Sequence, residues 1–189
     1  MKSQDLKKGN KESESSKKWL FTVSVLSFSL SIVFSYIATT TVNKLPIPIS
    51  ILVLLLVILI GVLFDMISMA VTIAQEKSFH AMASKKLDGA RTSIMLIRNA
   101  PKVASILSDV IGDICGILSG AIGTIVSLKI TSYYNMSFDI QIVISAVIAA
   151  LTIGGKAKLK FVAQEHSEVI VEKFSKVLSI FMINKKDRS

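Results

Sequence analysis

Two aspartates stand four residues apart inside a long apolar run of the sequence. They are Asp109 and Asp113, and a third, Asp65, lies inside another such run. Both runs are long enough to cross a bilayer, and a charge at the middle of a membrane helix costs about 2.5–3.5 kcal/mol on insertion scales. Three such residues in one short chain predict a compensating role, and the usual ones are ion binding, proton transfer and a buried charge pair.

The spacing of the pair also predicts its surroundings. Residues four apart on a helix share a face, so we expect Asp109 and Asp113 to point the same way. Glycines at four-residue spacing, which let helices approach closely, border that face: Gly112, Gly116 and Gly120. The carboxylates are therefore predicted to look into a tight helix interface and away from lipid.

Asp65 is predicted to lie at a similar depth in the membrane to Asp109 and Asp113. At about 1.5 Å per residue, Asp109 and Asp113 lie ~12 Å and ~18 Å from the start of their helix, and Asp65 lies ~15 Å from the matching end of an antiparallel span. Ser68 shares a face with Asp65, and Ser108 adds a hydroxyl beside Asp109. Carboxylate and hydroxyl oxygens are hard ligands that suit Mg²⁺. These five residues are the predicted metal site, with Mg²⁺ as the expected ion.

Three other interpretations of the aspartates stay open. Asp109 would sit near the headgroups if its helix projected into the cytoplasm, and the carboxylates would serve folding alone if they paired with Lys156 or Lys158. A proton relay is the third. The sequence contains no nucleophile–base constellation and no phosphate-binding glycine loop, so we expect no enzyme.

Four apolar stretches indicate an all-α, polytopic membrane protein. The mean hydropathy of the 189-residue chain is +0.62, well above that of ordinary soluble proteins, and stretches of about 20 apolar residues favour membrane helices. The predicted spans are 19–40, 47–74, 105–130 and 139–154. The last is short and ends at Gly154 and Gly155, where we expect a break or kink. The first is longer than a signal-peptide core and is predicted to be retained.

The predicted organisation places a flexible basic tail at 1–18 and an additional N-terminal membrane helix at 19–40. A core region follows at 47–183, and a basic tail ends the chain at 184–189. Two amphipathic helices are expected within the core, at 76–98 with an interruption at Asp88-Gly89, and at 156–183. Such helices lie on the membrane surface or pack on protein partners.

Charge predicts the orientation. The net charge is +9, and its basic residues gather before Trp19, between Glu76 and Lys102, and after Gly155, with only Lys44 and Lys129 elsewhere. Four crossings put every basic cluster in the cytoplasm, so we predict a multi-pass protein of the cell membrane with both termini cytoplasmic. Few aromatic residues lie among the basic ones, which argues against nucleic-acid binding.

From Gly61 to Phe181 the sequence resembles the transmembrane domain of the CorB/CorC and cyclin M (CNNM) family of magnesium transport proteins. The clearest stretch is LDGARTSIMLIRNAPKVASILSDVIGDI, and LFDMISMAVTIA and GGKAKLKFVAQEHSEVIVEKFSKVL resemble flanking segments. The resemblance implies a homodimer and a central Mg²⁺ site to which Asp65 and Ser68 contribute from one helix. It further implies that Asp109 and Asp113 replace asparagines on the second helix of that site.

Two departures from that family pattern bear on function. Lys156 stands where the family has Glu, and Leu159 where it has Pro. A cation at that position repels Mg²⁺ and offers the aspartates a charge partner. The nucleotide-binding CBS pair common in the family is not expected here, which leaves regulation to a separate subunit. The leading hypothesis is therefore a divalent-cation transport or binding protein of the bilayer; the alternative is a non-transporting scaffold or accessory subunit whose aspartates are neutralised by lysine.

Overall fold

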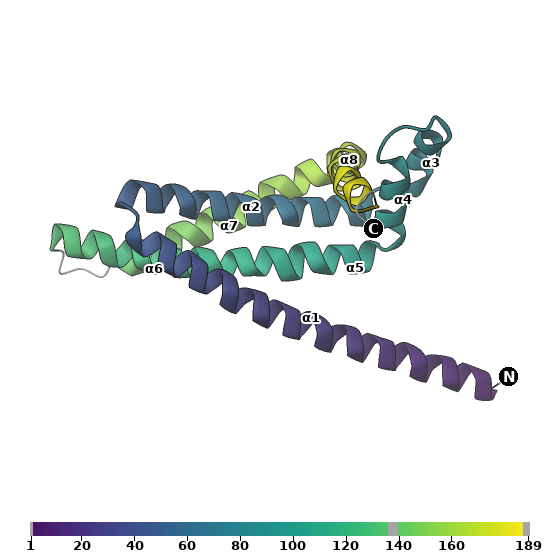
Figure 1. The fold of residues 1–189 in the computed structure, drawn as a ribbon, viewed down its shortest axis with the longest axis horizontal. Helices are drawn as coiled ribbons and strands as arrows, with labels where there is room; N and C mark the ends of the chain where they lie inside the picture. The colour runs from purple at the N-terminus through teal and green to yellow at the C-terminus, as the bar shows by residue number, and fades with distance from the viewer. Residues whose placement is uncertain (1, 136–139, 187–189) are drawn as a thin grey trace.

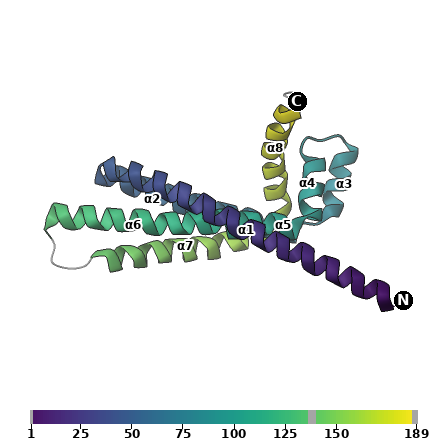
Figure 2. The ribbon, with the colours of Figure 1, turned by 60° about the horizontal axis from the view of Figure 1, so that its bottom comes forward.

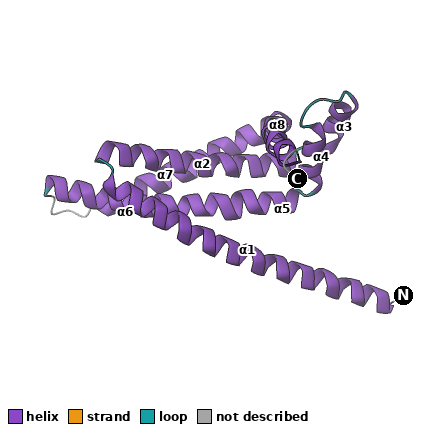
Figure 3. Ribbon diagram, viewed as in Figure 1, coloured by secondary structure: helices purple, strands orange, loops and turns teal. Residues whose placement is uncertain are grey.

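The computed structural model describes residues 2–135 and 140–186, and every regular element in them is a helix (Figures 1 and 3). Within these residues, 4 helical segments are long and apolar enough to cross a membrane: Phe21–Lys44, Ile47–Ile73, Ala100–Tyr134 and Ile140–Glu165. The all-α membrane class predicted from the sequence is confirmed. The predicted start of the last span, Asp139, and the final residues of the predicted basic tail, 187–189, lie outside the described residues.

The first helix, α1 (Lys2–Lys44), is longer than its predicted span. Residues 2–18, expected to be a flexible tail, continue the helix in the structure. The segment contains no proline, and its Lys and Glu residues are good helix formers, so a helix nucleated by the apolar span propagates into it. The helix packs on the bundle mainly through Leu30, Ala38 and Val42, and its N-terminal part projects away from the other helices (Figures 1 and 2).

The centre of the bundle is α2 (Ile47–Ile73), which contacts α6, α7 and α8. It starts after Pro46, with a second proline in its first turn, where a missing backbone N–H costs no hydrogen bond. Its Leu54, Ile58 and Val62 form a core with Ile122 on α6. The exposed large apolar side chains of α2 are Leu and Ile, as expected of a helix that is apolar all round.

The third span consists of three successive helical segments. It begins with α5 (Ala100–Ala104), continues as a π-helix, η1 (Ser105–Gly112), and ends as α6 (Asp113–Tyr134). From the sequence, the helix of this span is expected to start at Pro101, and the structure confirms this, because Pro101 lies in the first turn of α5. π-Helical segments are rare and occur frequently at functional sites, and this one contains two of the five predicted metal ligands.

The fourth span, α7 (Ile140–Glu165), runs unbroken through Gly154 and Gly155, so the predicted break at these glycines is wrong. Gly155 packs against Val62 of α2, 3.3 Å from the position of an added Cβ, which explains a small residue there without a break. The chain turns instead at His166, and the second amphipathic helix is α8 (Ser167–Lys186).

At one end of the bundle, α8 lies across the axis of the spans (Figures 1 and 2). It packs with α3 (Glu76–Ser84) and α4 (Ala90–Arg98) around a core that includes Phe79, Val71 and Val171. We call this the basic end. The predicted interruption between α3 and α4 is confirmed: Gly89 has φ 83°, a conformation that favours glycine.

An exposed polar cluster ties α3 to α4 at the basic end. Arg98 and His80 contact the carboxylate of Glu76 at 2.7 Å and 2.9 Å. The hydrogen bond from Arg98 is the largest influence and holds the pKa of Glu76 below its ordinary value.

Candidate functional site

The carboxylate of Asp65 receives two groups from neighbouring helices. Ser108, on η1, donates a hydrogen bond of 2.5 Å to its Oδ1. Lys156, on α7, places its Nζ 3.8 Å from the same oxygen. Ser108 precedes Asp109, so this hydrogen bond places Asp65 at a depth similar to that of Asp109, as predicted. The predicted pairing of an aspartate with Lys156 is found for Asp65.

This ion pair is loose and partly exposed. The side chains of Lys156 and Asp65 are 34% and 29% exposed, and 3.8 Å is longer than a hydrogen bond. The pair therefore neutralises charge without satisfying the donors of the ammonium group, and no hydrogen bond joins Lys156 to another of the described residues.

A cavity of ≈ 460 Å³ opens beside the pair, between α2, η1 and α7. Ser68 borders it but donates its hydroxyl hydrogen to the carbonyl oxygen of Ala104 at 3.1 Å. The cavity contains more basic than acidic groups, because Lys160 lines it together with Lys156, against a single carboxylate. Its lining residues are Asp65, Met66, Ser68, Met69, Ser108, Ile153, Lys156, Ala157 and Lys160.

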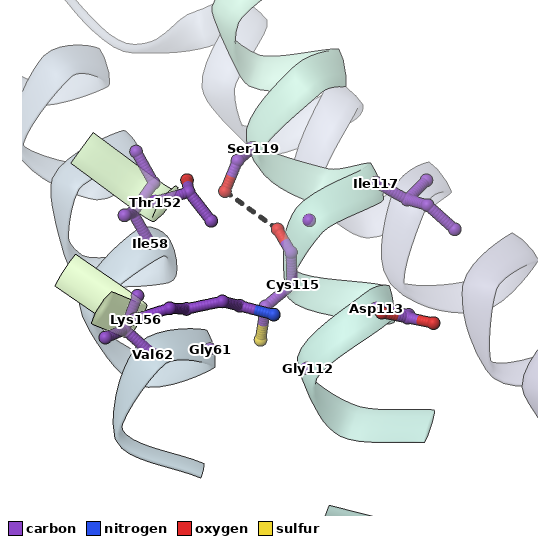
Figure 4. Close-up of a pocket in the computed structure, with 11 residues that line it drawn as sticks. Ile58, Gly61, Val62, Gly112, Asp113, Cys115, Ile117, Ser119, Thr152 and Lys156 are labelled. Carbon is purple, nitrogen blue, oxygen red and sulfur yellow. Dashed lines mark hydrogen bonds between the residues drawn. The ribbon is translucent and has the colours of Figure 1, made fainter. Parts of the chain in front are cut away.

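A second cavity of ≈ 380 Å³ lies next to the first, and Lys156 lines both. Figure 4 shows the lysine reaching from α7 toward Gly112 and Cys115 of the third span. Here the helices approach closely, since a Cβ on Gly61 would lie 2.8 Å from that of Cys115. Ser119 donates its hydroxyl to the backbone of Cys115 at 2.7 Å. The side chain of Lys156 thus lies on the boundary between the two hollows.

Two of the five predicted metal ligands lie apart from the other three. Asp109 and Asp113 are exposed, and Figure 4 shows the Asp113 side chain on the side of α6 away from Lys156. No group of three or more His, Cys, Asp or Glu residues suited to a metal ion forms among the residues described. The structure unites Asp65, Ser68 and Ser108 around one cavity. Asp113 lines the neighbouring cavity of ≈ 380 Å³, and Asp109 lines neither, so the five residues do not surround one cavity within the described chain.

The predicted tight interface uses a neighbouring face of the same helix. Ser108, Gly112 and Cys115 are among the residues that pack against α2, whereas an added Cβ on Gly116 or Gly120 would meet no described atom within 4 Å. Within one chain, the prediction that the carboxylates look into a helix interface is therefore wrong. Neighbouring residues on a helix point in directions about a quarter-turn apart, so the contact made by Ser108 turns the adjacent aspartate outward.

Sequence reasoning assigned no site role to two lysines that the structure places at cavities or buried carbonyl groups. Lys160 follows Lys156 by one helical turn, a spacing that signals a shared face. Lys129 lies at the opposite end of the bundle, where its ammonium group donates to the carbonyl oxygens of Val42 and Leu45, each at 2.5 Å, and to Ser50 at 3.2 Å. A lone lysine in an apolar helix was the only signal for this contact.

Comparison of the chain with models of protein families, with curated proteins and with solved structures finds no match. The membrane class therefore rests on the four long apolar helices, and the resemblance to the magnesium transport family rests on the residues of the chain itself.

Proposed function

We propose that this chain is a non-transporting scaffold or accessory subunit in the membrane, in which Lys156 takes the place of a metal ion beside Asp65. The observation that carries the proposal is the ion pair at 3.8 Å between these two side chains. A lysine held there supplies the positive charge that the carboxylate needs, so the bundle is stable with no ion bound.

Electrostatics at the cavity supports the same function. The lysine is 3.8 Å from the carboxylate, and its repulsion of a divalent ion is twice its attraction to a unit negative charge at the same distance. Mg²⁺ binds its oxygen ligands at about 2.0–2.1 Å, closer than the lysine lies, so Lys156 offsets part of the attraction between Asp65 and Mg²⁺. Lys160, which lines the same cavity, adds to the repulsion.

The family resemblance belongs to this proposal as well. We infer a member of the CorB/CorC and cyclin M family that has exchanged a Glu for Lys156 and so has lost the central ion. A protein of that kind acts through partners, and a homodimer or a separate regulatory subunit is the expected assembly. The exposed face with Asp109, Asp113 and the open glycines Gly116 and Gly120 is available for such a contact. We propose the cell membrane as its location, with the basic end and both termini in the cytoplasm.

Divalent-cation transport is the second candidate function. The observation in its favour is that oxygen atoms of Asp65, Ser68 and Ser108 line one cavity, drawn from two helices. These are ligands suited to Mg²⁺. Transport by this route requires Lys156 to leave the carboxylate.

Magnesium flux into liposomes separates the two functions. The purified protein is reconstituted with a Mg²⁺-sensitive dye inside the vesicles, and the wild type is compared with Asp65→Asn and Lys156→Met. Lys158→Met is the matched control, since this lysine lies on α7 but lines neither cavity. We expect no flux above empty liposomes for the wild type, and Mg²⁺ binding that tightens by about tenfold or more in Lys156→Met. Wild-type flux that Asp65→Asn abolishes would establish the transporter instead.

A further inference from the structure

We propose that the cavity between α2, η1 and α7 binds the phosphate of an anionic phospholipid, with Lys156 and Lys160 as its cationic ligands. The inference rests on the proposed function in one respect: the cavity must be free of a metal ion, as it is when Lys156 neutralises Asp65. It adds a ligand that neither the ion pair nor the family resemblance assigns.

The two lysines are placed to act together. They stand one turn apart on α7 and line the same cavity of ≈ 460 Å³. Lys156 lies 3.8 Å from Asp65 Oδ1, beyond hydrogen-bond distance, and no hydrogen bond or ion pair joins Lys160 to any residue that the structure describes. Both ammonium groups therefore retain donors for an oxygen-rich anion, and lysine is a common point-charge ligand of phosphate.

The depth of the cavity matches the level of lipid headgroups. From Ile140, the first described residue of α7, Lys156 lies about 24 Å and Lys160 about 30 Å along the helix at 1.5 Å per residue. The hydrocarbon core of a bilayer is ~30 Å thick. The lysines therefore mark the boundary between hydrocarbon and headgroups at the basic end, where basic pockets between spans bind anionic lipids.

The rest of the lining suits the apolar part of a lipid. Met66 and Met69 on α2 and Ile153 and Ala157 on α7 border the same cavity. Ile153 lies one turn or less before Lys156, on the hydrocarbon side, and is 68% exposed. A phospholipid seated here would place its phosphate between the lysines and its glycerol and first methylenes against these side chains.

The single carboxylate leaves room for an anion. Asp65 accepts the hydroxyl of Ser108 and neutralises one lysine, which leaves the second lysine unbalanced in the cavity. Free phosphate offers the same oxygen ligands as a lipid headgroup, but it has no apolar part to contact Met66, Met69 and Ile153. The lipid is therefore the ligand to which the cavity is matched.

Native mass spectrometry of the full chain tests this inference. The protein, purified in a neutral detergent, is titrated with phosphatidylglycerol, with phosphatidylcholine and with inorganic phosphate. The variants are Lys160→Gln, Lys160→Arg and the matched control Lys158→Gln. Lys160 lines the cavity but is not part of the ion pair, so its variants leave the Asp65–Lys156 contact intact.

We expect the wild type to retain phosphatidylglycerol in preference to phosphatidylcholine and inorganic phosphate. A lysine near a membrane surface contributes about 1 kcal/mol to binding an anionic lipid, so Lys160→Gln should lower retention roughly fivefold. Lys160→Arg should restore it, and Lys158→Gln should match the wild type.

Equal retention of the two lipids, or equal losses in Lys158→Gln and Lys160→Gln, would overturn the inference in favour of diffuse surface charge. Inorganic phosphate that binds as tightly as phosphatidylglycerol would overturn the assignment to a lipid. Neither result affects the absence of magnesium flux expected of the wild type, so failure here is distinguishable from failure of the proposed function.

Discussion

The ion pair between Asp65 and Lys156 makes a quantitative prediction about coupling. Asp65→Asn removes the charge but keeps an oxygen that accepts the hydroxyl of Ser108, and Lys156→Met removes the ammonium group but keeps the aliphatic stem. The free energies of unfolding of the two single variants, the double variant and the wild type form a cycle that isolates the pairwise term.

The expected coupling follows from distance and exposure. At 4 Å, unit charges attract by about 1 kcal/mol in water and about 4 kcal/mol at an effective dielectric of 20. Lys156 and Asp65 are each about one-third exposed and 3.8 Å apart, so solvent screening places their coupling near the lower limit, at about 1 kcal/mol. Asp65→Asn loses in addition about 1 kcal/mol, because the bond from Ser108 is no longer charge-assisted.

Unfolding in mixed micelles, titrated with dodecyl sulfate and followed by circular dichroism, measures these free energies. The control cycle pairs Asp65→Asn with Lys158→Met, whose lysine lies outside both cavities, and should show additivity within about 0.5 kcal/mol. If Asp65→Asn and Lys156→Met were equally additive, the lysine would not neutralise the carboxylate. The proposed function would then lose its main support.

Three further predictions concern the rest of the bundle. Lys129→Met should lower the free energy of unfolding by about 2–5 kcal/mol, because buried carbonyl oxygens lose a charged donor. The control Lys44→Met, at an exposed lysine, should change the free energy little. Thermal unfolding in detergent measures both variants. Gly61→Ala should destabilise the chain by about 1–3 kcal/mol, because the added methyl group would clash with Cys115 of the third span. Gly116→Ala should leave the stability unchanged unless a second copy covers that face. Cross-linking in liposomes reports whether such a second copy is present. The pKa of Glu76 is lowered in the folded chain, so its contribution to stability is present above the ordinary value of 4.5 and is lost as the pH falls below that value. Glu76→Gln should remove this acid-sensitive contribution. Hydrogen exchange of α3, measured over a pH series, tests it.

The sequence was sufficient for the four spans and for the relative depth of residues along them. Hydropathy located the spans because each must bury about 20 apolar residues, and the Asp88-Gly89 pair marked the break between α3 and α4. Rise per residue then placed Asp65 level with the region of Ser108, and the structure joins these two residues by a hydrogen bond. These quantities depend on local chemistry and simple counting, which need no knowledge of neighbouring helices.

Rotation of a helix about its own axis is harder to predict. The glycines that allow close approach and the aspartates occupy adjoining faces of one span, and the periodic pattern does not distinguish which face meets α2. Gly61 of α2 determines which face of the third span meets α2, because the absence of a side chain at Gly61 leaves space for Cys115. A pattern within one helix cannot reveal a steric match between two.

The rotation of the third span determines which aspartates can be neutralised within the chain. Asp65, turned inward, is neutralised within the chain by Lys156, whereas Asp109 and Asp113, turned outward, meet no cation among the described residues. A charge at mid-membrane costs about 2.5–3.5 kcal/mol, and it costs less toward the headgroups, where the level of Lys156 places Asp109; exposure to hydrocarbon remains unfavourable there. The pair therefore calls for water, headgroups or a second polypeptide beside α6. A second copy that presented the same face would bring carboxylate toward carboxylate, so close contact there would require protonation or a shared cation. The inner aspartate thus argues against a metal ion within one chain, and the outer pair leaves the question of an ion to the assembly.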